Sequence, residues 1–323
     1  MLILTAADIR IALPMKAAIE TQKQAYTAVA TRTANLPRRT PVTIPDQEAV
    51  TLFMPARIEN DLGAKIVSVF PKNIAKGLPL IHGLIIMIDS ETGQPAALLD
   101  ATYLTALRTA AGAGAATAIL ARPDAHIVAI IGSGALARTH ILAMCAVRPV
   151  SEVRIYSRNP DNVRQLIAEI QPLVEATLTG AASSAEAIST ADIVCCVTTS
   201  KSPVLAGNLL KPGTHVNGMG AFTLDMLEID NATIQRAGKV FVDEHQAALA
   251  EAGDVVDAIK KGLISESDLI EIGHLFTHSQ PGRTSTEAIT FFKSCGLAAQ
   301  DITAAGEVIR RAKQLNLGVE IDL

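Results

Sequence analysis

Residues 126–137, which read HIVAIIGSGALA, decide the fold of this 323-residue chain. An apolar strand pattern leads into a G-x-G-x-x-A turn, and a helical pattern begins immediately after it. In such a turn the first glycine allows a tight bend, the second lets the backbone approach a pyrophosphate, and the alanine lets the helix pack closely on the strand. The start of the helix would hold the phosphates. We therefore predict a dinucleotide site formed by Gly132, Ser133, Gly134, Ala135, Leu136 and Ala137.

The segment around this turn alternates strand patterns with helical patterns. The predicted strands are residues 126–131, 152–156, 192–197, 215–219 and 239–242. Such alternation is typical of a doubly wound parallel sheet. We therefore predict an α/β fold with a Rossmann dinucleotide-binding domain over residues 121–301.

The residues before this domain follow a different pattern. Helical spacing extends to about residue 36, and short strand patterns separated by turn-forming sequences follow it. These strands are predicted at residues 40–43, 50–54, 64–70, 84–89 and 96–99, as an antiparallel meander. Residues 101–120 read as a helix, and the Ala-rich residues 294–313 as a second helix that returns to the first domain. We predict an α+β domain made of residues 1–120 and 302–323.

Composition excludes several classes of protein. The chain has 28 Lys and Arg against 32 Asp and Glu, a net charge of −4, which argues against a basic nucleic-acid binder. The uncharged stretch between Arg108 and Arg122 has 13 residues, fewer than the roughly 18 that cross a bilayer. The first residues carry no early positive charge, so we expect a cytoplasmic protein without a secretory signal. Cysteines 145, 195, 196 and 295 fit no disulfide or metal pattern and are expected to be reduced.

The second strand of the Rossmann domain bears on the choice of nucleotide. An NAD site usually has an acidic residue at its end, where this chain has Ser157 followed by Arg158. Without the acid, a 2′-phosphate is not repelled, and Arg158 can bind it; a solvated surface arginine is the alternative. NADP(H) is thus the preferred cofactor, with NAD(H) possible. The ends of later strands add Thr198, Thr199, Met219 and Gly220 to the predicted cofactor site.

Two basic residues, Lys65 and Arg108, interrupt apolar stretches of the first domain. A buried cation needs a partner, and a substrate carboxylate could supply it. An internal salt bridge could do so equally well, and spacing alone does not separate the two. Arg39, next to Arg38, reads on spacing alone as a surface residue.

The histidines give weaker signals. His274 and His278 stand four residues apart, but no acid accompanies them in an HExxH arrangement, and we expect no metal site. His82 precedes a predicted strand, and its pattern is compatible with a structural role or with a place near substrate.

The chain resembles the ornithine cyclodeaminase/mu-crystallin family over essentially its whole length. The segments that carry the resemblance are FMPA (53–56), GAKIV (63–67), LTALRTAA (104–111), GSGALA (132–137), ADIV (191–194) and FKSCGLAAQD (292–301). The resemblance implies a homodimer whose first domain dimerises and holds substrate against the Rossmann domain. It also implies that Arg39, Lys65 and Arg108 contact an amino or imino acid. We expect Lys65 and Arg108 to be catalytic, and the substrate-binding residues to be Arg39, Met54, His82 and Phe222.

One position departs from the family pattern. Cyclodeaminases of this family carry an Asp two residues after the glycine that matches Gly220, where this chain has Phe222. A phenyl ring neither accepts a proton nor stabilises an ammonium group, so deamination of ornithine loses a central participant. Asp225 could replace it only from a rearranged loop, and we expect it on the following turn.

The resemblance and this departure together predict an NAD(P)H-dependent reductase of small cyclic imino acids, most plausibly one that converts Δ1-pyrroline-2-carboxylate to L-proline. Arg108, helped by Arg39, would hold the carboxylate, and Lys65 would bind near the imine. The proton donor stays open among Lys65, His82 and water. The alternatives are an alanine-type dehydrogenase, an ornithine cyclodeaminase and a mu-crystallin-like NADP-dependent binding protein.

Overall fold

The computed structural model describes residues 1–322, and the chain divides into two compact units. Unit 1 joins Met1–Arg108 to the C-terminal segment that begins at Leu297, and unit 2 is Thr109–Gly296. The sequence suggested divisions at residues 120/121 and 301/302. Among the described residues, no helix is both long and apolar enough to cross a membrane.

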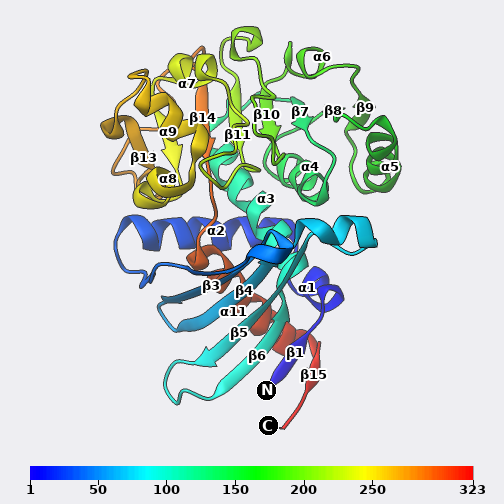
Figure 1. The fold of residues 1–323 in the computed structure, drawn as a ribbon, viewed down its shortest axis with the longest axis vertical. Helices are drawn as coiled ribbons and strands as arrows, with labels where there is room; N and C mark the ends of the chain where they lie inside the picture. Colours follow the sequence, from blue (N-terminus) through cyan, green and yellow to red (C-terminus); the bar gives the residue numbers. More distant parts are fainter. Residues whose placement is uncertain (323) are drawn as a thin grey trace. The chain divides into compact units, whose positions relative to one another are not determined.

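Unit 1 contains a seven-stranded sheet in the order β15-β1-β6-β5-β4-β3-β2 (Figure 1). The predicted antiparallel meander is confirmed, because each of the strands from β2 to β6 pairs antiparallel with the next along the chain. β1 and β15 were not predicted; β1 pairs parallel with β6, and β15 pairs antiparallel with β1. The strands are β1 Leu2–Leu4, β2 Thr40–Ile44, β3 Ala49–Ile58, β4 Asp61–Val69, β5 Ile81–Asp89, β6 Pro95–Asp100 and β15 Val319–Glu320.

Helices cover one face of this sheet. The predicted return of the C-terminal helix is confirmed, since α11 (Ala298–Leu315) packs on β3, β4, β5 and α2 (Met15–Ala30). It begins four residues later than predicted, because Gly296 has a φ of +85°, which a right-handed helix does not allow. The approach is close: a side chain at Gly306 would collide with the carboxylate of Asp61 at the start of β4. The short helix α1 (Ala6–Ala12) also packs on α11.

Unit 2 contains an eight-stranded parallel sheet in the order β13-β12-β14-β11-β10-β7-β8-β9. The predicted Rossmann arrangement is confirmed, while β9, β13 and β14 were not predicted. The strands are β7 Ile127–Ile131, β8 Glu152–Tyr156, β9 Thr177–Gly180, β10 Ile193–Cys196, β11 His215–Gly218, β12 Val240–Val242, β13 Leu269–Glu271 and β14 Thr290–Lys293. The helices are α4 Ala135–Val147, α5 Pro160–Ile170, α6 Ser184–Ile188, α7 Asn231–Ala237, α8 His245–Glu251, α9 Gly253–Lys260 and α10 Gly273–Phe276.

Helix α3 (Ala101–Leu120) has the predicted bounds. Gly112 and Gly114 are buried in it, and the absence of side chains there allows neighbouring elements to approach the helix closely. Two guanidinium groups satisfy carbonyls at its C-terminal end: Arg148 donates to Thr117 and other residues of the last turn, and Arg283 donates to Leu120. The end of a buried helix needs such partners, because its last carbonyls have none within the helix.

Candidate active site

The dinucleotide turn lies at the carboxyl end of β7. Gly132 has a φ of +115°, and its N–H donates to the Tyr156 carbonyl at 2.8 Å. This φ favours glycine, and a Cβ there would also be tightly placed, 3.0 Å from the Val197 carbonyl. Ala137 is fully buried, as its packing role predicts.

The start of α4 fits a phosphate group. Gly134 is the N-cap, it is exposed, and a Cβ there would meet nothing within 4 Å. The first turn of α4 contains no acidic residue that would neutralise the positive end of the helix dipole. Ser133 and Leu136 are half-buried and Ala135 is exposed, so the backbone of this turn is accessible to a pyrophosphate.

Ser157 and Arg158 follow β8, which is the parallel neighbour of β7. The carboxyl ends of parallel strands share one edge, so these residues lie at the same edge of the sheet as Gly132. Ser157 is half-buried and Arg158 is exposed. This position suits recognition of the ribose end of a dinucleotide.

The loops after β10 and β11 are tied together by a buried acid. Glu228 has no exposed surface, and its carboxylate accepts the N–H groups of Thr198 at 2.5 Å, Gly220 at 2.7 Å and Ala221 at 2.8 Å. Burial raises the pKa of Glu228, while Lys293 and the backbone donors oppose that shift. Glu228 therefore fixes the shape of the loops that carry the predicted Thr198, Thr199, Met219 and Gly220.

The acids near Phe222 are engaged elsewhere. Asp225 lies on the following turn, as predicted, where it is exposed and pairs with Lys201 at 2.7 Å. Glu228 is held by backbone donors, as described above. Phe222 itself is half-buried. No carboxylate in this loop therefore takes the place of the family's Asp.

Unit 1 contains a buried ion triad, which we define as Lys65, Arg108 and Asp301. Lys65 Nζ lies 2.5 Å from Asp301 Oδ2, and Arg108 Nε lies 2.8 Å from Asp301 Oδ1. The side chains are 2%, 6% and 0% exposed for Lys65, Arg108 and Asp301 respectively. The internal salt bridge that spacing left open is therefore present, and it joins both candidate cations to one acid.

The triad carries a surplus of positive charge. Burial lowers the pKa of Lys65 to about 8; Asp301 opposes this shift, and the charges of Arg108 and Arg39 add to it. Arg39, half-buried before β2, therefore lies close enough to act on Lys65 electrostatically. Lys65 and Arg108 share the single carboxylate of Asp301, so the triad keeps one surplus positive charge, which makes the site suitable for an anion.

Arg108 has one edge available. Its Nε is directed at Asp301, and within residues 1–322 its two terminal nitrogens have no protein partner. The end-on edge of a guanidinium matches the two oxygens of a carboxylate. The geometry is that of a carboxylate-binding arginine with its orientation already fixed.

The register of the sheet in unit 1 places the predicted substrate residues Met54 and His82 on opposite faces. Met54 pairs directly with Lys65 and is buried on the same face of the sheet. His82 lies within β5, not before the strand as expected, and pairs with Ser68. Side chains alternate along a strand, so the exposed His82 lies on the face opposite Lys65. Unit 1 thus brings together Arg39, Met54, Lys65 and Arg108, but not His82.

Sequence reasoning missed two residues. Asp301 is the last residue of a segment that carries the family resemblance, and neither it nor Glu228 was a predicted site residue. The available signal for Asp301 was a single acid inside the Ala-rich start of a buried helix, where an uncompensated charge would be costly. No local pattern marked Glu228.

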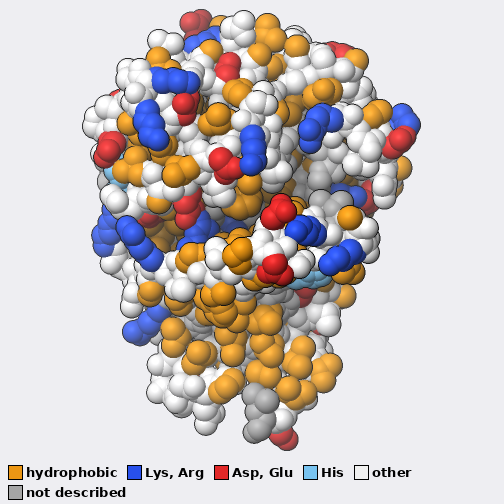
Figure 2. Space-filling view, viewed as in Figure 1, with side chains coloured by type: hydrophobic (Ala, Val, Ile, Leu, Met, Phe, Trp, Pro, Cys, Tyr) orange, Lys and Arg blue, Asp and Glu red, His pale blue; other side chains and the backbone are white. Residues whose placement is uncertain are grey.

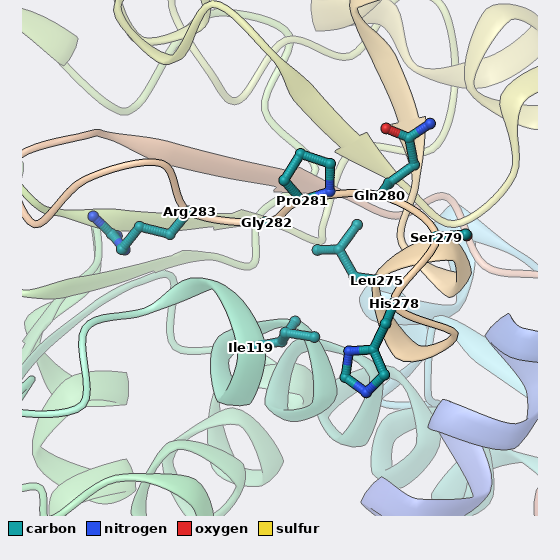
Figure 3. Close-up of a pocket in the computed structure, with 8 residues that line it drawn as sticks. All are labelled: Ile119, Leu275, His278, Ser279, Gln280, Pro281, Gly282 and Arg283. Atoms are coloured by element: carbon teal, nitrogen blue, oxygen red, sulfur yellow. The ribbon is translucent and has the colours of Figure 1, made fainter.

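Unit 2 also contains a cavity of about 530 Å³, and none of the predicted site residues lines it (Figure 3). It is lined by residues that include Ile119, Leu275, His278 and Arg283. Arg283 donates to the carbonyls of Leu120, Gly213 and Ala288, so its guanidinium group is bound to the backbone. Within the described residues, no cluster of three or more His, Cys, Asp or Glu side chains could hold a metal ion.

The parallel sheet, its glycine turn and the accessible start of α4 define a Rossmann-type nucleotide-binding protein. The chain belongs to the ornithine cyclodeaminase/mu-crystallin family, whose sequence pattern matches residues 1–316.

Three relatives indicate the chemistry found in this family. The chain is 35% identical to a Δ1-pyrroline-2-carboxylate reductase of Bacillus cereus, over 100% of both chains. The Thermococcus litoralis Δ1-pyrroline-2-carboxylate reductase, solved in complex with NADH and L-proline, superposes with a TM-score of 0.95 at 34% identity, covering 99% of this chain and 100% of that one. An archaeal alanine dehydrogenase dimer with bound NAD superposes with a TM-score of 0.92 at 31% identity, covering 100% of this chain and 99% of that one.

Proposed function

We propose that this protein is an NAD(P)H-dependent reductase that converts Δ1-pyrroline-2-carboxylate, or a closely related cyclic imino acid, to L-proline or its analogue. The observation that carries the proposal is the buried triad, which holds Arg108 by Nε and leaves its carboxylate-binding edge available. The full-length similarity to two Δ1-pyrroline-2-carboxylate reductases supports the same substrate.

In the proposed reaction, unit 1 holds the substrate and unit 2 holds the nucleotide. The terminal nitrogens of Arg108 bind the substrate carboxylate, and Arg39 adds positive charge nearby. The bound reduced nucleotide supplies the hydride to the imine carbon. Lys65 Nζ gives a proton to the imine nitrogen and recovers it from water. We favour Lys65 over His82 as proton donor, because His82 lies on the other face of its sheet.

Unit 2 would hold the nucleotide through the turn at Gly132–Gly134, the start of α4, and the loops that Glu228 ties together. We propose a preference for NADP(H), supported by Ser157 and the exposed Arg158 after β8. The two solved relatives, the Thermococcus litoralis reductase and the archaeal alanine dehydrogenase, hold NADH and NAD, and NAD(H) is the second cofactor in this proposal.

The test is steady-state oxidation of NADPH and of NADH with Δ1-pyrroline-2-carboxylate, compared with pyruvate plus ammonia. The expected result is a higher kcat/KM for the cyclic imine. The alanine dehydrogenase relative makes pyruvate plus ammonia the informative competitor. A higher kcat/KM for that pair would replace the proposal with an alanine-type dehydrogenase.

We also propose that the protein works as a homodimer, through the sheet face of unit 1 opposite to α11. This face exposes large apolar side chains, including Phe53 at 41%, Leu84 at 42% and Val42 at 48%. Figure 2 shows hydrophobic side chains gathered over the strands of this sheet. An apolar patch of this kind marks an interaction surface, and the alanine dehydrogenase relative is a dimer.

Sedimentation of the wild type and of Leu84→Lys tests this proposal. The expected result is a dimer for the wild type and dissociation of the variant. Leu173→Lys, at an exposed apolar residue of unit 2, is the matched control and should stay dimeric. A wild-type monomer would refute the proposed assembly.

We also propose a cytoplasmic location, which is supported by four cysteines without disulfide bonds.

A further inference from the structure

Asp301 is the only group of the triad for which the proposed reaction needs no direct contact. It is fully buried, and its two oxygens contact two cations that come from different elements, Lys65 on β4 and Arg108 on α3. Leaving two buried cations side by side without a carboxylate would be costly. Asp301 therefore has a defined electrostatic task in this site.

The position of Asp301 is fixed by its neighbour in α11. The Gln300 side chain donates to Gln22 Oε1 at 3.0 Å and to Tyr26 Oη at 2.8 Å, and accepts the Leu297 N–H at 2.8 Å. These contacts bind the start of α11 to α2. The carboxylate of Asp301 thus meets Lys65 and Arg108 from a rigid support.

We propose that Asp301 is a positioning residue for the reduction: it aims the end-on edge of Arg108 at the substrate carboxylate and keeps Lys65 in the ammonium form that gives up the proton. This inference rests on the proposed function and adds to it the group that controls both cations. One oxygen orients Arg108 through Nε, and the other pairs with Lys65.

The balance of the reaction shows why the charge state of Lys65 matters. The hydride adds to the imine carbon, the π pair of the C=N bond moves to nitrogen, and the nitrogen takes a proton from Lys65 Nζ. The substrate is reduced by two electrons and the nucleotide is oxidised. Lys65 is left neutral and regains its proton from water. A neutral Lys65 at the start of the cycle cannot perform this step.

The charged groups that act on Lys65 come from three elements. Asp301 on α11 favours the ammonium form, while Arg108 on α3 and Arg39 before β2 disfavour it. The residues directly opposite Lys65 on the neighbouring strands are Met54 and Ile85, which carry no charge. Asp301 is therefore the one acid in this set that can hold the proton on Lys65.

The experiment is the pH profile of kcat/KM for the wild type and Asp301→Asn, with the full-length protein. Since the pKa of Lys65 lies at about 8, wild-type kcat/KM should fall above that pH. In Asp301→Asn the nearby negative charge is lost, so the alkaline limb, the fall of kcat/KM on the alkaline side of the profile, should begin roughly one pH unit or more lower. The maximum value of kcat/KM should decrease about 10²-fold. A limb that stays in place in a folded variant overturns the proposal.

Two variants separate a charge effect from a packing effect. Asp301→Glu keeps the charge, so its limb should stay near that of the wild type while kcat/KM falls. Asp61→Asn is the matched control, because Asp61 also binds α11 through Arg310 but lies outside the triad. If Asp301→Asn does not fold, Asp301→Glu still tests the proposal. An alkaline fall of its kcat/KM that begins one pH unit lower than in the wild type would count against the proposal.

A direct measurement keeps this inference distinct from the proposed function. The pKa of Lys65 can be followed by NMR of 13C-labelled lysine in the ligand-free protein, with Lys65→Arg assigning the signal. The expected result is a lower pKa in Asp301→Asn than in the wild type. An unchanged pKa refutes the inference even if the wild type reduces the imine. A wild type without reductase activity refutes the proposed function, and a lowered pKa in Asp301→Asn would then still show that Asp301 controls the charge of Lys65.

Discussion

Two fully buried carboxylates, one in each unit, are held in opposite ways. In unit 2, Glu228 accepts backbone N–H groups from two loops. In unit 1, Asp301 accepts a hydrogen bond from Arg108 Nε and forms an ion pair with Lys65. A carboxylate bound to backbone fixes the shape of loops, whereas one bound to cations fixes their direction and charge state. Substitutions at Glu228 in unit 2 should therefore change nucleotide affinity and the free energy of unfolding. Substitutions at the triad in unit 1 should change kcat/KM.

The largest effect is expected for Arg108→Lys. Lysine keeps the charge but loses the planar edge that binds both carboxylate oxygens, so kcat/KM should fall about 10³-fold. Nucleotide affinity, measured by fluorescence titration, should not change. Arg310→Lys, at an exposed arginine paired with Asp61, is the control and should retain activity. Unchanged turnover in Arg108→Lys would make Arg108 a structural residue and remove the contrast between the units.

The next effect concerns Phe222. Release of ammonia from L-ornithine with NAD+ should be negligible for the wild type. In the loop around Phe222, neither Asp225 nor Glu228 replaces the family's Asp, and a general acid/base contributes about 10²–10⁴-fold in rate. Phe222→Asp should gain measurable release. Robust release by the wild type would instead require Asp225 or Glu228 to leave the partners they have here.

Glu228→Gln tests the backbone-bound carboxylate. The amide NH2 would face a backbone N–H, and an unsatisfied buried donor costs about 1–3 kcal/mol in free energy of unfolding. Urea unfolding should report that loss, and nucleotide affinity should fall with it. The limb of the pH profile near 8, set by Lys65, should stay in place. Glu169→Gln, an exposed acid paired with Arg138, is the matched control. If the alkaline fall of kcat/KM shifted in Glu228→Gln, Glu228 would influence the charge of Lys65, and the two carboxylates would not act independently.

Arg158→Ala is expected to have a smaller effect. The wild type should bind NADPH more tightly than NADH, and the variant should narrow the ratio about ten-fold, the value of one charge-assisted hydrogen bond. Arg164→Ala, at an exposed arginine of α5, should leave the ratio unchanged. Titration that shows tighter NADH binding by the wild type would refute the interpretation of Ser157 and Arg158.

The smallest expected effect is a loss of folding stability at low pH that comes from buried histidines of unit 2. Among the described residues, the buried histidines are His140 and His215, both in unit 2, and burial lowers their pKa values to about 4 and about 3. The unfolded chain binds protons below a pH of about 6.5 while these native histidines do not, so stability falls as the pH decreases. Between roughly pH 6.5 and 5.5, His140→Met should lose about 1 kcal/mol less stability than the wild type.

Urea unfolding at both pH values measures the difference. His278→Asn is the control, because His278 is exposed and its positive φ suits asparagine. Equal losses of stability in His140→Met and the wild type would show that protonation of His140 does not contribute.

Local patterns predicted the elements that depend on nearby residues. The bounds of β8 and α3 were predicted to the residue, as was the glycine turn after β7. The short strands β9, β13 and β14 were missed. β14 is the last strand of its sheet along the chain, yet it lies between β11 and β12. Its pairing partners lie some fifty to eighty residues away, and no periodicity within four residues contains that information.

The sequence by itself determined the Rossmann turn, the meander and the candidate cations, because backbone sterics and side-chain periodicity act over a few residues. Only the tertiary structure decided which charges meet. Arg108 and Asp301 are 193 positions apart, and the return of α11 to the sheet of unit 1 brings them within 2.8 Å. The sheet register likewise decided that Met54 shares a face with Lys65 and that His82 does not. Ion pairs and strand faces depend on long-range closure of the chain, so they appear only when the whole unit has folded.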